Sequence, residues 1–253
     1  MTTVAWKSAD VVVIGGGIIG TAIAYFLSCQ KINVILLEKS CIESGSSGAC
    51  DGGVVMQTKK PGVHFNLALE SHALLSQIQD QLPVPIEYEK SGGLIVMETE
   101  DEKTAMKQFV EAQRQTGLDV ELLDHKQVRT LAPHLSEHLI GATYSPWDGK
   151  INPIALTLGF AMGAKQMGSE ILTGTAVLDI ELEGKQISAV VTAAGKIETR
   201  MVVNATGVYA SEIGRMLGIE IPIKPIRIAA SESFTPRIRL YSGTTNSTKP
   251  AIM

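Results

Sequence analysis

The sequence predicts an α/β fold in which a parallel β-sheet is interleaved with a second, α+β part of the chain. Three observations lead to this prediction. Short apolar runs that end at glycine, such as Val11 to Ile14, are typical of parallel strands buried on both faces. Segments with apolar residues at helical spacing follow these runs. Only 5% of the residues are aromatic while 24 are glycine, which suits an interior of aliphatic side chains connected by tight turns.

The first 38 residues contain one complete βαβ pattern. The apolar run Val11 to Ile14 predicts a strand, and Ile18 to Gln30 carries apolar residues at the spacing of a helix. A second apolar run, Ile32 to Leu37, predicts the next strand and ends at Glu38. A parallel pair joined by a helix follows from this order.

The middle of the chain predicts a different architecture. Ser44 to Gly53 is rich in glycine and serine, so we expect an ordered loop there. The elements expected next are a helix, two strands and a second helix, at Asn66 to Gln81, Ile86 to Tyr88, Gly93 to Met97 and Asp101 to Gly117. Mixed helices and short strands of this kind indicate an α+β domain.

The last third returns to the character of the first. Asn152 to Gly168 predicts a helix with Pro153 in its first turn. Glycine-punctuated apolar runs then predict four strands, at Ile171 to Leu172, Ala176 to Leu182, Ile187 to Thr192 and Ile197 to Val203. We therefore expect one domain from residues 1–80 and 150–222, interrupted by a second domain from residues 81–149 and 223–253.

Composition and charge exclude several functional classes. A formal net charge of −4 provides no basic footprint, so we expect no nucleic-acid partner. Cys29, Cys41 and Cys50 have no metal-ligand spacing and are a poor disulfide framework, which favours a reducing cytoplasm and no metal. No apolar run approaches the roughly 20 residues that span a bilayer. We expect a cytoplasmic protein without an integral membrane segment, and peripheral membrane contact remains an alternative.

The strongest motif is the GxGxxG sequence from Gly15 to Gly20, directly after a strand and at the start of a helix. Gly15 permits the turn, Gly17 allows the backbone to approach a pyrophosphate, and Gly20 allows the helix to pack on the strand. The helix N-terminus at Ile18 and Ile19 attracts the phosphate charge. Glu38 stands at the interval of roughly 20 residues at which an acid binds an adenosine ribose. This combination predicts a Rossmann-like dinucleotide site, without separating NAD from FAD.

Later motifs resemble those of the glycine oxidase and D-amino-acid oxidase-like flavoproteins, in the family's order. They are Ser44-Gly45-Ser46-Ser47-Gly48-Ala49 with Gly52-Gly53, Trp147-Asp148-Gly149 with Pro153, Gly174-Thr175-Ala176-Val177, and Asn204-Ala205-Thr206-Gly207. The resemblance implies FAD as the cofactor. It implies contacts to FAD from Gly15, Gly17, Ile18, Ile19, Gly20, Glu38, Lys39, Ser46, Ser47, Gly52, Gly53, Val177, Ala205, Thr206 and Gly207. Because Ala49 stands where some relatives carry a tethering histidine, the resemblance implies noncovalent FAD.

The resemblance also implies the reaction. Cys50-Asp51-Gly52, Gln57 and Lys59-Lys60-Pro61-Gly62 are most similar to the amino-acid dehydrogenase, hydrogen cyanide synthase and sarcosine oxidase β-subunit branch. Such enzymes oxidise a small amino acid or N-alkyl amino acid by hydride transfer to flavin N5, leaving an imine. The sequence leaves open whether oxygen, a quinone or another carrier reoxidises the flavin, and which amine is the substrate.

The sequence identifies no catalytic residue. Lys59 and Lys60 follow the glycine-rich loop, and Arg227 lies in an alternating segment that resembles a substrate-domain strand. Each could bind a substrate carboxylate, although an exposed charge is the more common role of such residues.

Chains of this family continue beyond the length of the present one, with a C-terminal segment that closes over the flavin. We therefore expect a fragment, a truncated product, or one subunit of a split enzyme whose partner subunit supplies that segment. The alternatives to an active oxidoreductase are an FAD-binding subunit without independent activity and a nicotinamide-linked dehydrogenase. The nicotinamide alternative is disfavoured because its cofactor would not need the Ser46 loop or the Ala205-Thr206-Gly207 turn.

Overall fold

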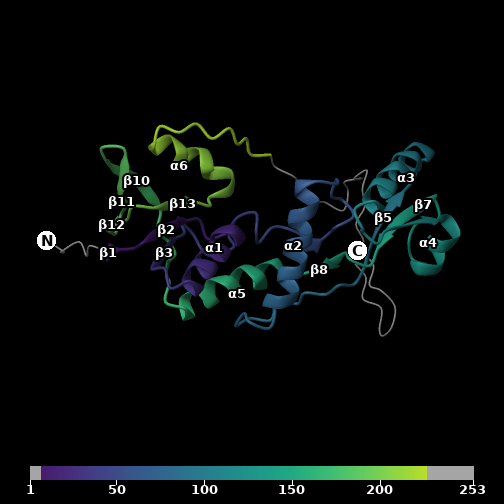
Figure 1. Cartoon of the computed structure of the whole chain (residues 1–253), viewed down its shortest axis with the longest axis horizontal. Helices are drawn as coiled ribbons and strands as arrows, with labels where there is room; N and C mark the ends of the chain where they lie inside the picture. The colour runs from purple at the N-terminus through teal and green to yellow at the C-terminus, as the bar shows by residue number, and fades with distance from the viewer. Residues whose placement is uncertain (1–6, 227–253) are drawn as a thin grey trace. The chain divides into compact units, whose positions relative to one another are not determined.

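The computed structural model describes residues 7–226, which form two compact units (Figure 1). Within the described residues the first unit contains 7–51, 80–86 and 152–226, and the second contains 52–79 and 87–151. The chain therefore leaves the first unit and returns to it twice. Residues 52–79 pack within the second unit, whereas the functional boundaries expected at residues 80, 150 and 222 remain a prediction. Between residues 7 and 226, no helix combines the length and apolar character needed to cross a membrane.

A four-stranded parallel sheet forms the centre of the first unit. Its strands are β2 (Val11–Ile14), β3 (Val34–Leu37), β9 (Glu170–Leu172) and β13 (Val202–Asn204), in the order β13-β2-β3-β9. Every residue of β2 and β3 is buried, as their continuous apolar sequence predicts for central parallel strands. The expected βαβ unit is therefore present.

Two helices, α1 (Ile18–Cys29) and α5 (Pro153–Gln166), pack against each other in this unit (Figure 1). Pro153 occupies the first turn of α5, and the Asn152 side chain accepts a hydrogen bond from the Ala155 amide at 3.0 Å. A Cβ at Gly163 would lie 2.8 Å from the ring of Tyr25, so glycine permits the close approach of the two helices.

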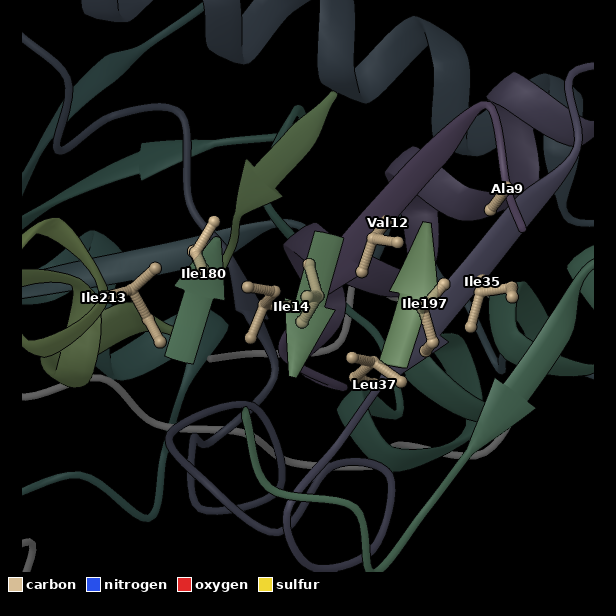
Figure 2. Close-up of a cluster of buried hydrophobic side chains, with 9 residues drawn as sticks. Ala9, Val12, Ile14, Ile35, Leu37, Ile180, Ile197 and Ile213 are labelled. Carbon is tan, nitrogen blue, oxygen red and sulfur yellow. The ribbon is translucent and has the colours of Figure 1, made fainter. Parts of the chain in front are cut away.

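A second sheet of the first unit has the order β1-β12-β11-β10. Its strands are β1 (Lys7–Ser8), β10 (Val177–Glu183), β11 (Gln186–Thr192) and β12 (Gly195–Glu198). Together with the parallel sheet and α6 (Ala210–Met216) it encloses an apolar cluster (Figure 2). The cluster consists of Ala9, Val12, Ile14, Ile35, Leu37, Ile180, Val190, Ile197 and Ile213.

The single strand expected at Ile197 to Val203 is wrong, because β12 and β13 belong to different sheets. The Thr199 hydroxyl exchanges hydrogen bonds with the Met201 backbone, at 3.0 Å to the carbonyl and 3.2 Å from the amide. This local turn ends β12, and the chain then enters the parallel sheet as β13.

The second unit contains an antiparallel sheet and three helices. The sheet, in the order β5-β7-β6, is formed by β5 (Gly93–Met97), β6 (Glu121–Asp124) and β7 (Gly141–Ser145). The helices are α2 (Val63–Ile78), α3 (Glu100–Arg114) and α4 (His125–Leu131), and β4 (Gly53–Val54) pairs with β8 (Gly149–Lys150). The strand expected at Ile86 to Tyr88 is wrong: Glu87 has a φ of 53°, which interrupts the extended backbone, and only Glu89 forms a bridge, to Lys150.

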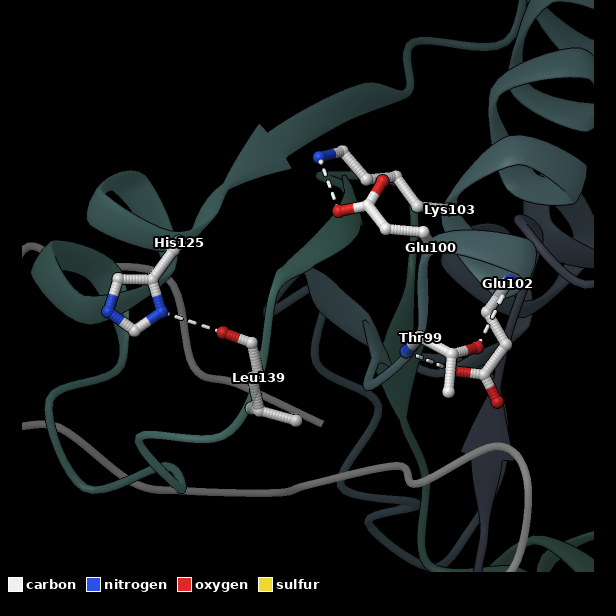
Figure 3. A network of polar contacts seen from close by, with 6 residues as sticks. All are labelled: Thr99, Glu100, Glu102, Lys103, His125 and Leu139. Carbon is white, nitrogen blue, oxygen red and sulfur yellow. Dashed lines mark hydrogen bonds and ion pairs between the residues drawn. The ribbon is translucent and has the colours of Figure 1, made fainter.

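Local hydrogen bonds fix the ends of α3 and α4. Thr99 and Glu102 form a reciprocal capping box at the start of α3, in which the Thr99 hydroxyl accepts from the Glu102 amide at 3.2 Å (Figure 3). Asp124 and Gln127 form the same arrangement at the start of α4. His125 Nδ1 lies 2.6 Å from the Leu139 carbonyl oxygen, which connects α4 to the segment that leads into β7.

Candidate functional site

Four chain segments leave the parallel sheet at the same edge. Asn204 pairs with Ile14, Ile14 with Leu37, and Leu37 with Leu172, so the four strands end at the same level. The segments that follow are the glycine turn at 15–20, the segment at 38–40, the segment at 173–177 and the turn at 205–207. The carboxyl edge of an open parallel sheet is where α/β proteins bind nucleotides.

The glycine turn is shaped by its neighbours. Gly15 has a φ of 113°, and a Cβ there would lie 2.5 Å from the Ala205 carbonyl oxygen. A Cβ at Gly20 would lie 1.9 Å from the Gly15 carbonyl oxygen, and one at Gly17 would lie 3.0 Å from Ser47 Oγ. Only glycine fits at positions 15 and 20. The turn therefore has no side chains of its own that would cover its backbone.

The N-terminus of α1 points out of this turn. Ser47 Oγ accepts a hydrogen bond from the Ile18 amide at 2.9 Å, which connects the serine-rich loop to the helix. The Ile19 amide lies in the first turn and has no acceptor within the helix, and the Ile19 side chain is 63% exposed. Free first-turn amides and the helix dipole together attract an anion.

Glu38 is buried beside the glycine turn, with 9% of its surface exposed. Its Oε2 accepts from the Gly16 amide at 2.7 Å, and its Oε1 accepts from the Ser40 amide at 2.8 Å. An ionised carboxylate has about four lone-pair positions, so each oxygen can accept a further hydrogen bond. The two hydroxyls of a ribose are donors of the kind that this carboxylate can bind.

The turn after β13 is held by its own side chains. Asn204 Oδ1 accepts from the Thr206 hydroxyl at 2.7 Å, and Asn204 Nδ2 donates to the Ala210 carbonyl at 2.9 Å. These bonds fix Ala205, Thr206 and Gly207 next to Gly15. The 3-10 helix η1 (Gly207–Tyr209) follows, and Lys39 Nζ lies 3.3 Å from the centroid of the Tyr209 ring.

The segment that leads into β10 lies beside Glu38. The Thr175 amide donates to the Glu38 carbonyl at 2.8 Å, and the Gly174 amide donates to the Ser40 carbonyl at 2.9 Å. Val177 begins β10 two residues later and packs against the apolar cluster of this unit. Ser46 is exposed, whereas its neighbour Ser47 is half-buried.

The first unit thus brings together most of the residues expected to contact a dinucleotide. They are Gly15, Gly17, Ile18, Ile19, Gly20, Glu38, Lys39, Ser47, Ala205, Thr206 and Gly207, with Val177 close by through Thr175. A Cβ on the glycines of this turn would fill the space that a pyrophosphate needs, and the glycines leave that space open. These residues therefore fit the ADP half of FAD. Gly52, Gly53, Lys59 and Lys60 belong to the second unit. Arg227 lies outside the described residues.

A buried polar network in the second unit is centred on Asp148, which is 1% exposed. Its Oδ1 accepts from the amides of Met56 and Gln57, at 2.7 and 3.2 Å, and its Oδ2 accepts from Gln57 Nε2 at 2.6 Å. Burial raises the pKa of Asp148, while the hydrogen bonds from Gln57 and Met56 and the charge of Lys59 oppose that rise. The Thr143 hydroxyl also donates to the Gln57 side chain.

This network fixes the backbone that carries Lys59. Gln113 is fully buried, and its Nε2 donates to the carbonyls of Gln57 and Lys59 at 2.8 and 2.9 Å. Lys59 is half-buried and Lys60 is exposed. Sequence reasoning missed Gln113 and Thr143, because a lone glutamine or threonine within a helix or strand carries no motif.

Possible metal ligands and thiols occur among the described residues. Among residues 7–226 no group of three or more His, Cys, Asp or Glu side chains could hold a metal ion. Cys50 is exposed and its thiol donates to the Ser47 carbonyl at 3.4 Å, whereas a free cysteine of this kind is more often buried.

Comparison with known proteins gives three kinds of likeness. A family model described as FAD dependent oxidoreductase (DAO) matches residues 10–239. The mitochondrial pyruvate dehydrogenase phosphatase regulatory subunit of Mus musculus is 31% identical over 247 residues, which are 97% of this chain and 28% of that protein.

Two solved structures are also similar. The glycine oxidase of Bacillus cereus ATCC 14579 superposes with a TM-score of 0.77 at 34% identity, covering 82% of this chain and 58% of that one. The L-proline dehydrogenase of P. horikoshii superposes with a TM-score of 0.79 at 30% identity, covering 85% and 57%. The chain thus spans less than two thirds of the length of each of these proteins.

Proposed function

Because this chain belongs to the family of FAD dependent oxidoreductases, we propose that it forms the FAD-binding part of an enzyme that oxidises a small amino acid or N-alkyl amino acid. The observation that carries the proposal is the glycine turn with Glu38 at the carboxyl edge of the parallel sheet. Residues 1–80 and 150–222 are assigned to FAD binding. Residues 81–149 and 223–253 are assigned to the substrate.

In this proposal the residues of the first unit hold the ADP half of FAD. The backbone at Gly17 and the Ile19 amide bind the pyrophosphate, and Glu38 accepts hydrogen bonds from the ribose. Ser47 keeps the serine-rich loop at the start of α1. Bound FAD supplies a hydride acceptor for the carbon next to the substrate nitrogen.

The substrate class is supported by the similar proteins and by the positive charge of Lys59 in the second unit. Glycine oxidase and L-proline dehydrogenase are named for small amino acids. A substrate of this class carries a carboxylate, and Lys59 provides a positive charge on a backbone that Gln113 fixes. Lys60 and Arg227 remain further candidates for the same role.

A second candidate is an FAD-binding subunit that requires a partner subunit for turnover. It is favoured by one observation: a similar protein of Mus musculus is named as a regulatory subunit. A nicotinamide-linked dehydrogenase receives no support from a family that depends on FAD.

Equilibrium FAD binding tests the proposal directly. Purified chain is reconstituted with FAD, and the dissociation constant is measured from the quenching of flavin fluorescence. Glu38→Gln should weaken binding by about tenfold or more, because hydrogen bonds to a charged acceptor contribute about 1.5–3 kcal/mol. Glu212→Gln, on an exposed glutamate of α6 in the same unit, is the matched control and should bind like the wild type. A wild-type chain that retains no FAD would contradict the proposal.

Anaerobic flavin reduction separates the two candidates. Glycine, sarcosine, proline and D-amino acids are mixed in turn with the yellow protein, and the flavin absorbance is followed by stopped flow. Bleaching by one of them supports the oxidoreductase and identifies its substrate class. Yellow protein that none of them bleaches favours the subunit without independent activity.

A further inference from the structure

A lysine–tyrosine contact crosses the candidate cofactor edge. Lys39 lies two residues after the end of β3, and Tyr209 ends the 3-10 helix that follows β13. The sheet order is β13-β2-β3, so these two strands lie on opposite sides of β2. A contact of 3.3 Å between Lys39 Nζ and the Tyr209 ring centroid must therefore pass across the end of β2, where the glycine turn begins.

Neither partner is held there by core packing. Tyr209 is 44% exposed, and Lys39 is exposed as well. The neighbouring carboxylate of Glu38 already accepts from two backbone amides, those of Gly16 and Ser40. In the described part of the chain no ion pair includes Lys39. The contact of the Lys39 ammonium at the sheet edge is therefore the aromatic face of Tyr209.

We propose that Tyr209 is a positioning residue for cofactor binding, which holds the Lys39 ammonium across the glycine turn so that its charge faces the FAD pyrophosphate. The inference rests on the proposed binding of FAD. A lysine side chain has a flexible four-carbon stem and loses much conformational freedom when a ligand orders it. A ring that orders the side chain in advance removes part of that loss, and the ordered charge adds to the attraction of the α1 N-terminus.

Four variants test this inference through the dissociation constant of FAD at several salt concentrations. Tyr209→Leu removes the ring and should weaken binding about two- to fivefold, the range of an exposed cation–π contact. Tyr209→Phe keeps the ring and should bind like the wild type. Lys39→Met should weaken binding at least as much as Tyr209→Leu and should reduce the salt dependence. Lys185→Met removes an exposed charge in the same unit, away from this edge, and should leave both quantities unchanged.

The double variant Lys39→Met with Tyr209→Leu distinguishes positioning from a general structural effect. If Tyr209 acts through Lys39, then Tyr209→Leu should have no further effect in the Lys39→Met background. An equal loss in both backgrounds would overturn the inference, as would wild-type affinity in Tyr209→Leu. Either result leaves FAD binding by the wild type intact, so the proposed function survives. Absence of FAD binding by the wild type would overturn both.

Discussion

At the scale of single residues, the glycine turn is constrained by the atoms around it. The tightest position is Gly20, where a Cβ would lie 1.9 Å from the Gly15 carbonyl oxygen. We expect Gly20→Ala to lower the free energy of unfolding by at least about 2 kcal/mol, because the helix must move away from the strand. Urea denaturation measures the effect. Gly45→Ala, where nothing lies within 4 Å, should change stability by less than about 0.5 kcal/mol, and equal losses in the two variants would contradict the steric explanation.

His72 makes the stability of the second unit depend on pH. The imidazole is 4% exposed and its Nε2 lies 3.0 Å from the Trp147 carbonyl oxygen. Burial lowers the pKa of His72, the charge of Lys90 lowers it further, and the Trp147 carbonyl opposes both. In the unfolded chain a histidine has a pKa of about 6.5. As pH falls through that value the unfolded state takes up the proton first, so the free energy of unfolding should decrease.

Urea denaturation at pH 7.5 and pH 5.5 measures this dependence. His72→Gln should show a smaller loss of stability between the two pH values than the wild type. His134→Gln replaces an exposed imidazole in the same unit and should show the wild-type dependence. A wild-type dependence in His72→Gln would show that another group is responsible.

The residues of the cofactor edge differ in how far the sequence predicts them. Gly15, Gly20 and Glu38 are predictable because the turn, the helix start and the acid lie within 24 residues of each other. The Lys39–Tyr209 contact joins positions 170 residues apart, and Asp148 binds Gln57 across 91 residues. Neither distance is a motif spacing, so only the folded chain reveals these pairs.

At the scale of helices and strands, the α3 capping box is the clearest local determinant. Thr99 and Glu102 each accept a hydrogen bond from the other's backbone amide, at 3.2 and 3.1 Å. Thr99→Ala should lower the free energy of unfolding by about 1 kcal/mol. Thr104→Ala, at an exposed position inside the same helix, should be neutral or slightly stabilising because alanine favours helices. A loss of equal size in Thr104→Ala would show that the cap is not responsible.

The predictable elements are those whose pattern is long or glycine-bounded. The strand at Val11 to Ile14, and the helices now observed as α1, α3 and α5, follow from periodicity and flanking residues. The short elements β6, α4 and β7 were not predicted. They owe their existence to pairing within the antiparallel sheet and to the Asp124–Gln127 capping box at the start of α4.

At the scale of the whole molecule, FAD should protect the two units unequally. A ligand that binds the folded state raises the free energy of opening where it binds. Hydrogen exchange read by mass spectrometry should therefore slow most in residues 15–20, 38–47 and 205–209, and least in β5 and β7. Glu38→Gln at the same FAD concentration should lose most of this protection. Protection confined to β5 and β7 would contradict the assignment of FAD to the first unit.

The interleaved chain also sets the order in which the two units can form during synthesis. All the described residues of the second unit have been made once the ribosome reaches residue 151, whereas β2 waits for β13, whose Val202 pairs with Val12. At about 5–20 residues per second, the ribosome needs roughly 3 to 10 seconds to reach Asn204 from that point. For that time β2 has an unpaired strand edge, so the incomplete parallel sheet is open to chaperones and to aggregation.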